Sequence, residues 1–252
     1  MKVIVCVKQI PDPALPGELD PSTNTLKRDG KLILDESDSY GVEMALQLVD
    51  AAGGGEVALV SMAPNDEMSG MRTALAMGAA QGLLVSDPAL AGSDALTTAK
   101  VLAAAVQRLG GADLVLAGTE SSDGYTGTVP EQMAEALGLP SVTFAKKVTV
   151  DGSTLNVDRQ TEAGYDEVTC PLPALVSVTA GVVEPRYPSF KGIMAAKRKQ
   201  IATESAAAPS ARTAVAGTVD PPGREPGVKL EGEPEELVAD LIRRLNTEAG
   251  VL

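Results

Sequence analysis

Short apolar runs alternate with segments of helical period over the first 140 residues, and this alternation limits the possible folds more than any other feature. Each run has the length of a strand and is continuously apolar, as expected for strands buried on both faces of a parallel sheet. The runs cover residues 3–7, 57–60, 83–85 and 114–116. Strands that alternate with helices pack as a right-handed, doubly wound parallel sheet. We therefore predict a Rossmann-like α/β fold.

Capping residues and glycines mark the ends of the helices expected between these runs. An Asp, Asn or Ser side chain favours a helix start, and glycine accepts the left-handed turn that ends one. The expected helices begin at Asp38, at Asn65 and at Ser93 or Asp94, and they end at 53–55, near Gly78 and at 110–111.

The pattern changes after Pro140. Segments 142–150 and 154–159 flank Asp151-Gly152, which is a strong hairpin signal. Residues 167–170 and 174–179 have the composition of further strands. We expect these segments to form an antiparallel addition to the sheet.

The last fifty residues differ from the rest of the chain. Residues 202–218 are rich in Ala, Ser, Thr and Pro and lack periodicity, which indicates an extended arm. A helix is expected after Pro234, with a narrow stripe formed by Leu237, Leu241 and Leu245. We predict an α/β nucleotide-binding domain over 1–200, and over 201–252 an arm and helix that pack on a partner subunit.

Charge and composition exclude several classes of function. The net charge of −13 argues against a nucleic-acid partner, which needs clustered Lys and Arg. The chain has no histidine and two cysteines, which removes His-dependent catalysis and most zinc chemistry. We therefore expect neither a metal site nor catalytic residues. No apolar run is long enough for a signal peptide or a membrane span, and we expect a cytoplasmic protein without membrane insertion.

The most informative segment lies between the run at 114–116 and a helix expected over 130–137. This loop delivers a helix N-terminus at the carboxyl end of a parallel strand, where free amides and the helix dipole bind phosphate. Gly124 and Gly127 would allow an anion to approach the backbone, and Asp123 could bond a ribose or brace the loop. A plain polar βα loop remains an equal alternative, because neither a Walker loop nor a GxGxxG pattern is present.

Other segments are expected at the same edge of the sheet. These are the ends of two strands, with Cys6 and Met62 as a soft wall for an adenine, and the acidic stretch that contains Asp35 and Asp38. Cys6 and Met62 have an equally good interpretation as core residues.

Several segments, in order along nearly the whole chain, resemble the beta subunit family of electron-transfer flavoproteins. They are 5–12, the helix segment 72–79, the loop 118–130, the hairpin with 157–159, Glu162, Gly164 and 172–175, the stretch 184–197, and the arm from Val219 to the final helix. Ala163, Asp166 and the filling Tyr125-Thr126-Gly127 depart from the usual pattern.

The resemblance implies an electron carrier rather than an enzyme. Members pair with an electron-transfer flavoprotein alpha subunit that carries most of the FAD site. The heterodimer accepts electrons from primary dehydrogenases, such as the acyl-CoA dehydrogenases of fatty acid oxidation, and passes them to a membrane quinone oxidoreductase. The beta subunit holds AMP as a structural ligand, or a second FAD in bifurcating members. The unusual loop filling leaves that choice open.

The resemblance also assigns residues to sites in this chain. The nucleotide site would use Gly118, Asp123, Gly124, Thr126, Gly127, Thr128 and Val129 of the loop, with Cys6, Asp35, Asp38 and Met62 around them. A docking loop for dehydrogenases would use Tyr187, Phe190, Ile193, Met194 and Lys197. A local core around Phe190 is the alternative to that loop. For the whole chain, the alternatives are a nucleotide hydrolase and a regulator that acts alone.

Overall fold

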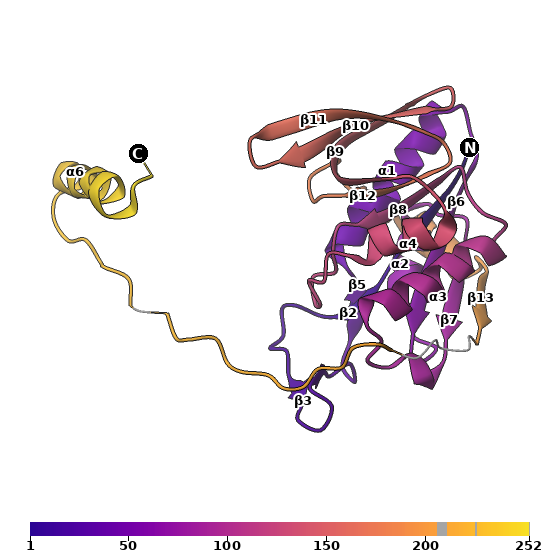
Figure 1. Cartoon of the computed structure of the whole chain (residues 1–252), viewed down its shortest axis with the longest axis horizontal. Helices are drawn as coiled ribbons and strands as arrows, with labels where there is room; N and C mark the ends of the chain where they lie inside the picture. The colour runs from indigo at the N-terminus through magenta and orange to yellow at the C-terminus, as the bar shows by residue number, and fades with distance from the viewer. Residues whose placement is uncertain (206–210, 225, 252) are drawn as a thin grey trace. The chain divides into compact units, whose positions relative to one another are not determined.

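The structure is a computed structural model that describes residues 1–205, 211–224 and 226–251. The chain divides into two compact units, Met1–Ala216 and Gly217–Leu252. The first unit is a doubly wound α/β fold, as predicted, and holds every element up to β13 (Figure 1). The arm residues 206–210 and 225, and the last residue, lie outside the described part of the chain.

Within the described residues, nine strands form one sheet in the order β11-β10-β9-β12-β8-β1-β6-β7-β13. From β9 to β13 neighbouring strands are parallel, and β10 and β11 add an antiparallel extension at one edge. The strands are β1 Lys2–Cys6, β6 Glu56–Ala63, β7 Gln81–Ser86, β8 Leu114–Gly118, β9 Ser141–Asp151, β10 Thr154–Thr161, β11 Gly164–Pro171, β12 Ala174–Val178 and β13 Ile201–Glu204.

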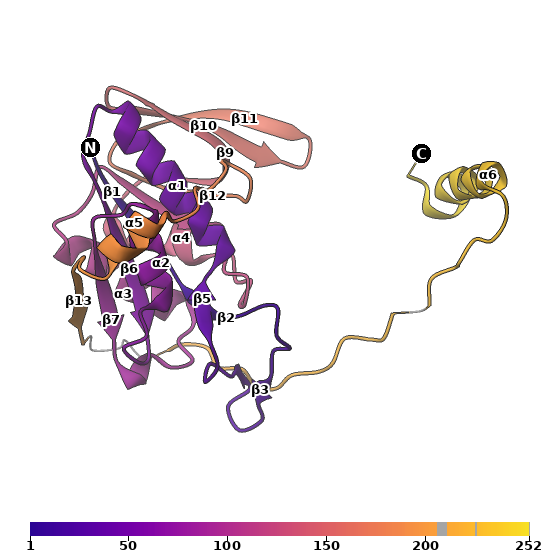
Figure 2. The ribbon, with the colours of Figure 1, turned by 180° about the vertical axis from the view of Figure 1, so that it is seen from behind.

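Helices cover both faces of the sheet. On one face lie α1 Glu36–Ala51, α2 Ser69–Met77 and α5 Phe190–Ala196 (Figure 2); on the other lie α3 Ala95–Arg108 and α4 Val129–Leu137 (Figure 1). A 3₁₀ turn, η1 Pro88–Leu90, precedes α3. Two small pairs, β2 Gln9–Pro11 with β5 Leu32–Leu34 and β3 Leu19–Asp20 with β4 Thr25–Leu26, occupy the chain between β1 and α1.

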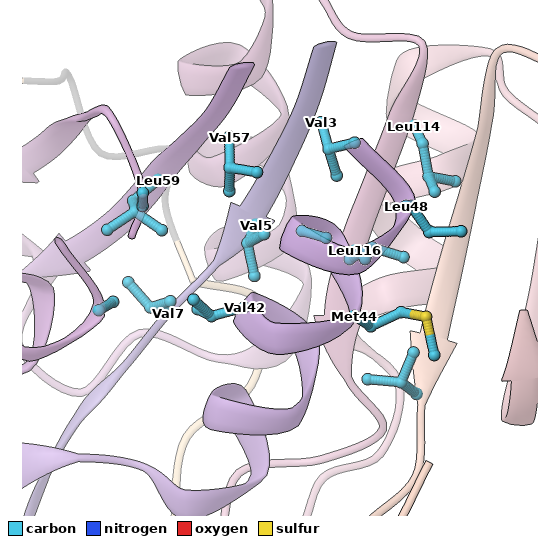
Figure 3. Packing of buried hydrophobic residues seen from close by; sticks show 14 of the residues in the cluster. Val3, Val5, Val7, Val42, Met44, Leu48, Val57, Leu59, Leu114 and Leu116 are labelled. Carbon is cyan, nitrogen blue, oxygen red and sulfur yellow. The ribbon is translucent and has the colours of Figure 1, made fainter. Parts of the chain in front are cut away.

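The core is aliphatic, as a chain with 2% aromatic residues requires. Val3 and Val5 of β1 pack with Val42 of α1 and with Leu59 and Leu116 of the neighbouring strands (Figure 3). All five side chains are fully buried, and each such burial contributes about 1.5–3 kcal/mol. The continuous apolar runs therefore mark strands that are covered on both faces.

Two helix starts differ from the prediction. Asp35, not Asp38, is the N-cap of α1, with its carboxylate accepting from the amide of Ser37. Asp38 lies inside the first turn and is buried. In the second helix Met68 is the N-cap, and Asn65 instead closes a turn with the amide of Glu67 before the helix begins.

Two strand assignments also differ. Residues 174–178 are not part of the antiparallel addition, because β12 lies between β8 and β9 and is parallel to both. Residues 201–204, assigned to the arm, form the edge strand β13 beside β7. The hairpin at Asp151-Gly152 is confirmed, since β9 and β10 pair across it.

The second unit contains α6 Pro234–Arg244, continued by a π-helical turn, η2 Leu245–Ala249. The expected helix after Pro234 is therefore confirmed. Asp240 pairs with Arg243 and with Arg244, which stabilises the end of the helix. No residue of α6 is buried within the described chain, and Leu241 is 48% exposed.

Candidate functional site

The order in which the chain adds strands to the sheet reverses between β1 and β8, although the two strands are parallel. From β1 the chain proceeds outward through β6 and β7, and it then returns to the other side of β1 to form β8. The helices after β1 and β8, α1 and α4, lie on opposite faces. In open α/β sheets, ligands bind outside the carboxyl ends of the strands at this switch point. Here that position is occupied by Lys8 and by the loop 119–128, which we call the nucleotide loop after the site predicted for it.

Two acidic residues from the start of α1 hold the nucleotide loop and the end of β1. The Asp35 carboxylate accepts from the amide of Ser122 at 2.8 Å and also from its hydroxyl, while it caps α1. Asp38 accepts from the amide of Lys8 at 2.6 Å. Burial raises the pKa of Asp38 well above its usual value, and the charge of Asp35 adds to this effect.

Asp123 joins the nucleotide loop to two cations. Its side chain is only 5% exposed; it pairs with Lys8 at 2.6 Å and with Arg28. Lys8 also donates to the hydroxyl of Ser121 at 3.1 Å. Burial alone would raise the pKa of Asp123, but Lys8 and Arg28 outweigh it, so the pKa lies below its usual value. These contacts brace the loop.

The start of α4 differs from the starts of the other helices of the sheet. Asp35 caps α1, Asp94 caps α3, and the side-chain oxygen of Gln9 accepts from the amide of Met71 in the first turn of α2. At α4, Thr128 stands in the N-cap position and makes no side-chain cap hydrogen bond. In the described part of the chain, the Thr128 side chain thus leaves the first-turn amides of α4 uncapped, and such amides are the groups that bind an external anion. Pro130 lies in the first turn, as predicted.

Near the start of α4, the backbone of the loop allows a ligand to approach closely. Gly127 has φ +60°, in the left-handed region that favours glycine, and a Cβ there would lie 3.4 Å from the carboxylate of Glu120. Tyr125 also has a positive φ, of 49°, and its ring is exposed. Gly124, Thr126, Gly127 and Thr128 thus lie in the loop at the switch point, while Gly118 ends β8 before it and Val129 begins α4 after it.

Cys6 and Met62, the expected adenine wall, belong to the apolar cluster between the sheet and helices α3 and α4. Cys6 is buried with its sulfur 3.8 Å from that of Met133 in α4, and burial raises the pKa of its thiol. Met62 is half-buried and packs against the same apolar cluster. Both residues therefore have core contacts, and their contact with an adenine remains a prediction.

Sequence reasoning missed two cations of this site. Lys8 directly follows the apolar run 3–7, and Arg28 lies in a stretch without periodicity. No local signal identifies Arg28, because its partner Asp123 is 95 residues away. Lys8 does have a local signal, because it is a basic residue directly after the first buried strand, at the edge of the sheet where ligands bind.

The predicted docking residues gather on α5 and the turn before it. Tyr187 is 93% exposed and Phe190 is 81% exposed, so Phe190 has no local core within the described chain. Ile193, Met194 and Lys197 are exposed as well. We call Tyr187, Phe190, Ile193 and Met194 the apolar docking patch.

Ion pairs and carbonyl contacts attach this patch to the sheet-covering helices. Arg186 forms a bidentate pair with the buried Glu43 of α1, with its Nε at 2.6 Å. Arg72 of α2 donates to the carbonyls of Ala196 and Lys199, and Lys199 donates back to two carbonyls near the end of α2. The ammonium group of Lys199 is thus bonded within the protein.

Among the described residues, no cluster of three or more His, Cys, Asp or Glu side chains is arranged to hold a metal ion. Across the same residues, no helix has the length and apolar character needed to cross a membrane.

The fold and site define a doubly wound α/β protein with a braced loop and an open helix end at its switch point. The model of the electron transfer flavoprotein domain family matches residues 23–209. The chain therefore belongs to the electron transfer flavoprotein family, as the resemblance implied.

Three relatives show how far the similarity extends. Electron transfer flavoprotein subunit beta of Mycobacterium tuberculosis is 40% identical over 204 residues, which cover 79% of this chain and 77% of the relative. The protein of the same name from Megasphaera elsdenii is 35% identical over 261 residues, covering 96% of each chain. Caffeyl-CoA reductase-Etf complex subunit CarD of Acetobacterium woodii is 33% identical over 257 residues, covering 97% of this chain and 98% of the relative.

Proposed function

We propose that this chain is the beta subunit of an electron-transfer flavoprotein and binds AMP at its nucleotide loop. It pairs with an alpha subunit that carries most of the FAD site, accepts electrons from dehydrogenases such as acyl-CoA dehydrogenases, and delivers them to a membrane quinone oxidoreductase. FAD supplies the electron-carrying chemistry when it is bound. The subunit itself has no catalytic residues and works in the cytoplasm.

The observation that carries the nucleotide proposal is the uncapped start of α4 on a loop that is already braced. Asp123 and Asp35 hold the loop through Lys8, Arg28 and Ser122, so ligand binding need not order it. The amides of Gly127, Thr128 and Val129 then receive the phosphate, favoured by the helix dipole. Asp123 acts as a brace rather than as a base.

The direct test is mass spectrometry of the denatured, purified complex, which identifies the bound nucleotide. We expect AMP in this chain at one equivalent, together with FAD from the partner. A complex of full stability that releases no nucleotide from this subunit would contradict the proposal.

A matched pair of glycine variants tests the position. Gly127 and Gly152 have nearly the same backbone, with φ of +60° and +58°, but Gly152 lies in the β9–β10 hairpin turn with open space around it. Gly127→Val should lower AMP occupancy at least about tenfold by crowding the phosphate, while partner FAD stays bound. Gly152→Val carries the same backbone strain and should leave AMP occupancy unchanged. Equal AMP content in the two variants would exclude the nucleotide loop.

A second arrangement is favoured by one comparison. The relative from Acetobacterium woodii is a subunit of a reductase–Etf complex and matches 97% of this chain. In this alternative the chain holds a second FAD in a bifurcating complex. Two FAD per heterodimer and no AMP in the same mass spectrum would establish it.

A further inference from the structure

Residues 13–30, which we call the insert, form an excursion between β2 and β5. The antiparallel pairing of those two strands closes its base. The insert contains the two-residue strands β3 and β4, and most of its side chains are exposed, including Leu15 and Leu19. With so little apolar burial, packing supplies little of its order.

Arg28 is the polar link between the insert and the rest of the chain. Its Nη1 donates to the carbonyl of Gln9 at 3.2 Å, and its Nη2 donates to the carboxylate of Asp123. The other hydrogen bonds of residues 13–30 stay within the insert or reach its base at Asp12, as far as the described residues show. One side chain therefore tethers the insert, and its partner is the brace of the nucleotide loop.

The forked geometry is specific to arginine. A planar guanidinium can serve a carbonyl and a carboxylate at once, whereas an ammonium is a single point charge. The Asp123 side chain that receives this contact is only 5% exposed. Loss of Arg28 leaves the carboxylate with Lys8 alone and partly uncovered, which loosens the loop as well as the insert.

We propose that Arg28 is a positioning residue for the nucleotide loop, and that through it the order of the insert depends on nucleotide bound at that loop. This inference rests on the proposed nucleotide site. Linkage makes the coupling reciprocal: a ligand that orders the loop orders the insert, and an ordered insert raises ligand affinity.

The test compares wild type, Arg28→Ala, Arg28→Lys and Lys27→Ala as full-length proteins. Lys27 pairs with Glu18 inside the insert and is the matched control for a lost ion pair next to Arg28. Amide hydrogen exchange is followed in 13–30 and in 119–129, with and without saturating AMP. The AMP dissociation constant is measured by titration calorimetry.

We expect Arg28→Ala to raise the AMP dissociation constant about tenfold and to speed exchange in both segments. AMP should slow exchange in the insert of wild type and Lys27→Ala, but not in that of Arg28→Ala. Arg28→Lys, which keeps the charge without the fork, should fall between them. A merely structural role would speed exchange in the insert without removing its response to AMP.

Two failures are distinguishable. If wild type binds neither AMP nor FAD in this chain, the nucleotide proposal fails together with the coupling, whatever the exchange of the variants. If wild type binds AMP and Arg28→Ala binds it equally well, with unchanged exchange in 119–129, the nucleotide proposal stands and the role of Arg28 is overturned.

Discussion

At the scale of single residues, the site contains two buried carboxylates whose pKa values are shifted in opposite directions. Asp123 is buried between two cations, which keep its pKa low. Asp38 is buried near Asp35, which raises its pKa. The two aspartates lie at one end of the sheet. Asp38 accepts a hydrogen bond from a neutral backbone amide, whereas Asp123 forms ion pairs with two cations. Substitution by asparagine should therefore affect them differently.

Asp38→Asn should change the pH dependence of stability. The folded-state pKa of Asp38 is raised, so its contribution to the free energy of unfolding, relative to asparagine, is complete below the unfolded pKa of about 3.9. That contribution is lost as the pH rises through the folded-state pKa. The wild type should lose about 1.4 kcal/mol per pH unit relative to the variant within that window. Urea unfolding of both proteins from pH 4.5 to 8 measures this difference.

The control for this experiment is Asp50→Asn, an exposed aspartate on the same helix. Parallel stability curves for wild type and Asp38→Asn across the pH range would contradict the prediction. Asparagine can still accept from the Lys8 amide, so the fold should be retained.

At the scale of elements, one helix cap also holds the beginning of the arm. Asp94 caps α3 through the amide of Thr97 at 2.8 Å, and its other oxygen accepts from the amides of Arg212 and Thr213. Asp94→Asn should keep the cap but present an amide group to those donors. We expect faster proteolysis within 211–216 at nearly unchanged stability. Asp94→Ala should lose the cap as well, at a further cost of about 1 kcal/mol. Equal protease sensitivity of wild type and Asp94→Asn would show that this contact does not hold the arm.

Helix α5, which carries most of the predicted docking residues, presents its apolar side chains from a supported backbone. Ser189 caps it, and a Cβ at Gly192 would collide with the carbonyl of Ala76 on α2, so α5 sits directly on α2. Phe190→Ala should raise the apparent Michaelis constant for a donor dehydrogenase about tenfold, because one buried anchor can contribute about 2 kcal/mol. FAD content and pairing should not change. Steady-state reduction assays measure the constant.

The matched control is Leu15→Ala, another exposed apolar residue that lies in the insert. An unchanged Michaelis constant for Phe190→Ala across several dehydrogenases would exclude the patch as an anchor. Added salt should weaken docking further if Lys197 and Arg198 meet an acidic surface.

At the scale of the whole molecule, the second unit lacks a hydrophobic environment of its own. The apolar stripe of α6 and η2 has no buried residue in the described chain. Burial of Leu237, Leu241 and Leu245 would contribute about 4–9 kcal/mol before ordering costs. Residues 206–210 of the arm lie outside the described part of the chain, so the truncation is placed after Ala216, where the first unit ends. This truncation should strongly lower the affinity for the partner subunit.

Full-length chain with the three leucines replaced by serine should reproduce the effect of truncation, and Glu235→Ser should not. Analytical ultracentrifugation or calorimetry with the partner subunit measures the affinity. Pairing that survives both truncation and the leucine replacements with unchanged affinity would show that α6 is not an interface element.

The sequence by itself determined the fold class and most helix ends. Continuous apolar runs specify strands covered on both faces, and glycines such as Gly78 and Gly138 end helices wherever the chain places them. The nucleotide loop could be located for the same reason: Pro130 after a buried strand predicts a helix start at the edge of the sheet. These features are local patterns of neighbouring residues, so they can be recognised in the sequence without knowledge of the fold.

Tertiary structure alone decided the features that depend on distant partners. The position of β12 between β8 and β9 follows from which strands pair, which a single apolar run does not encode. Asp35 replaced Asp38 as the cap because Asp38 is drawn to the Lys8 amide. Arg28 became part of the site because folding brings it to Asp123, 95 residues away. Ion pairs between residues far apart in the chain leave no period in the sequence, so only the folded chain reveals them.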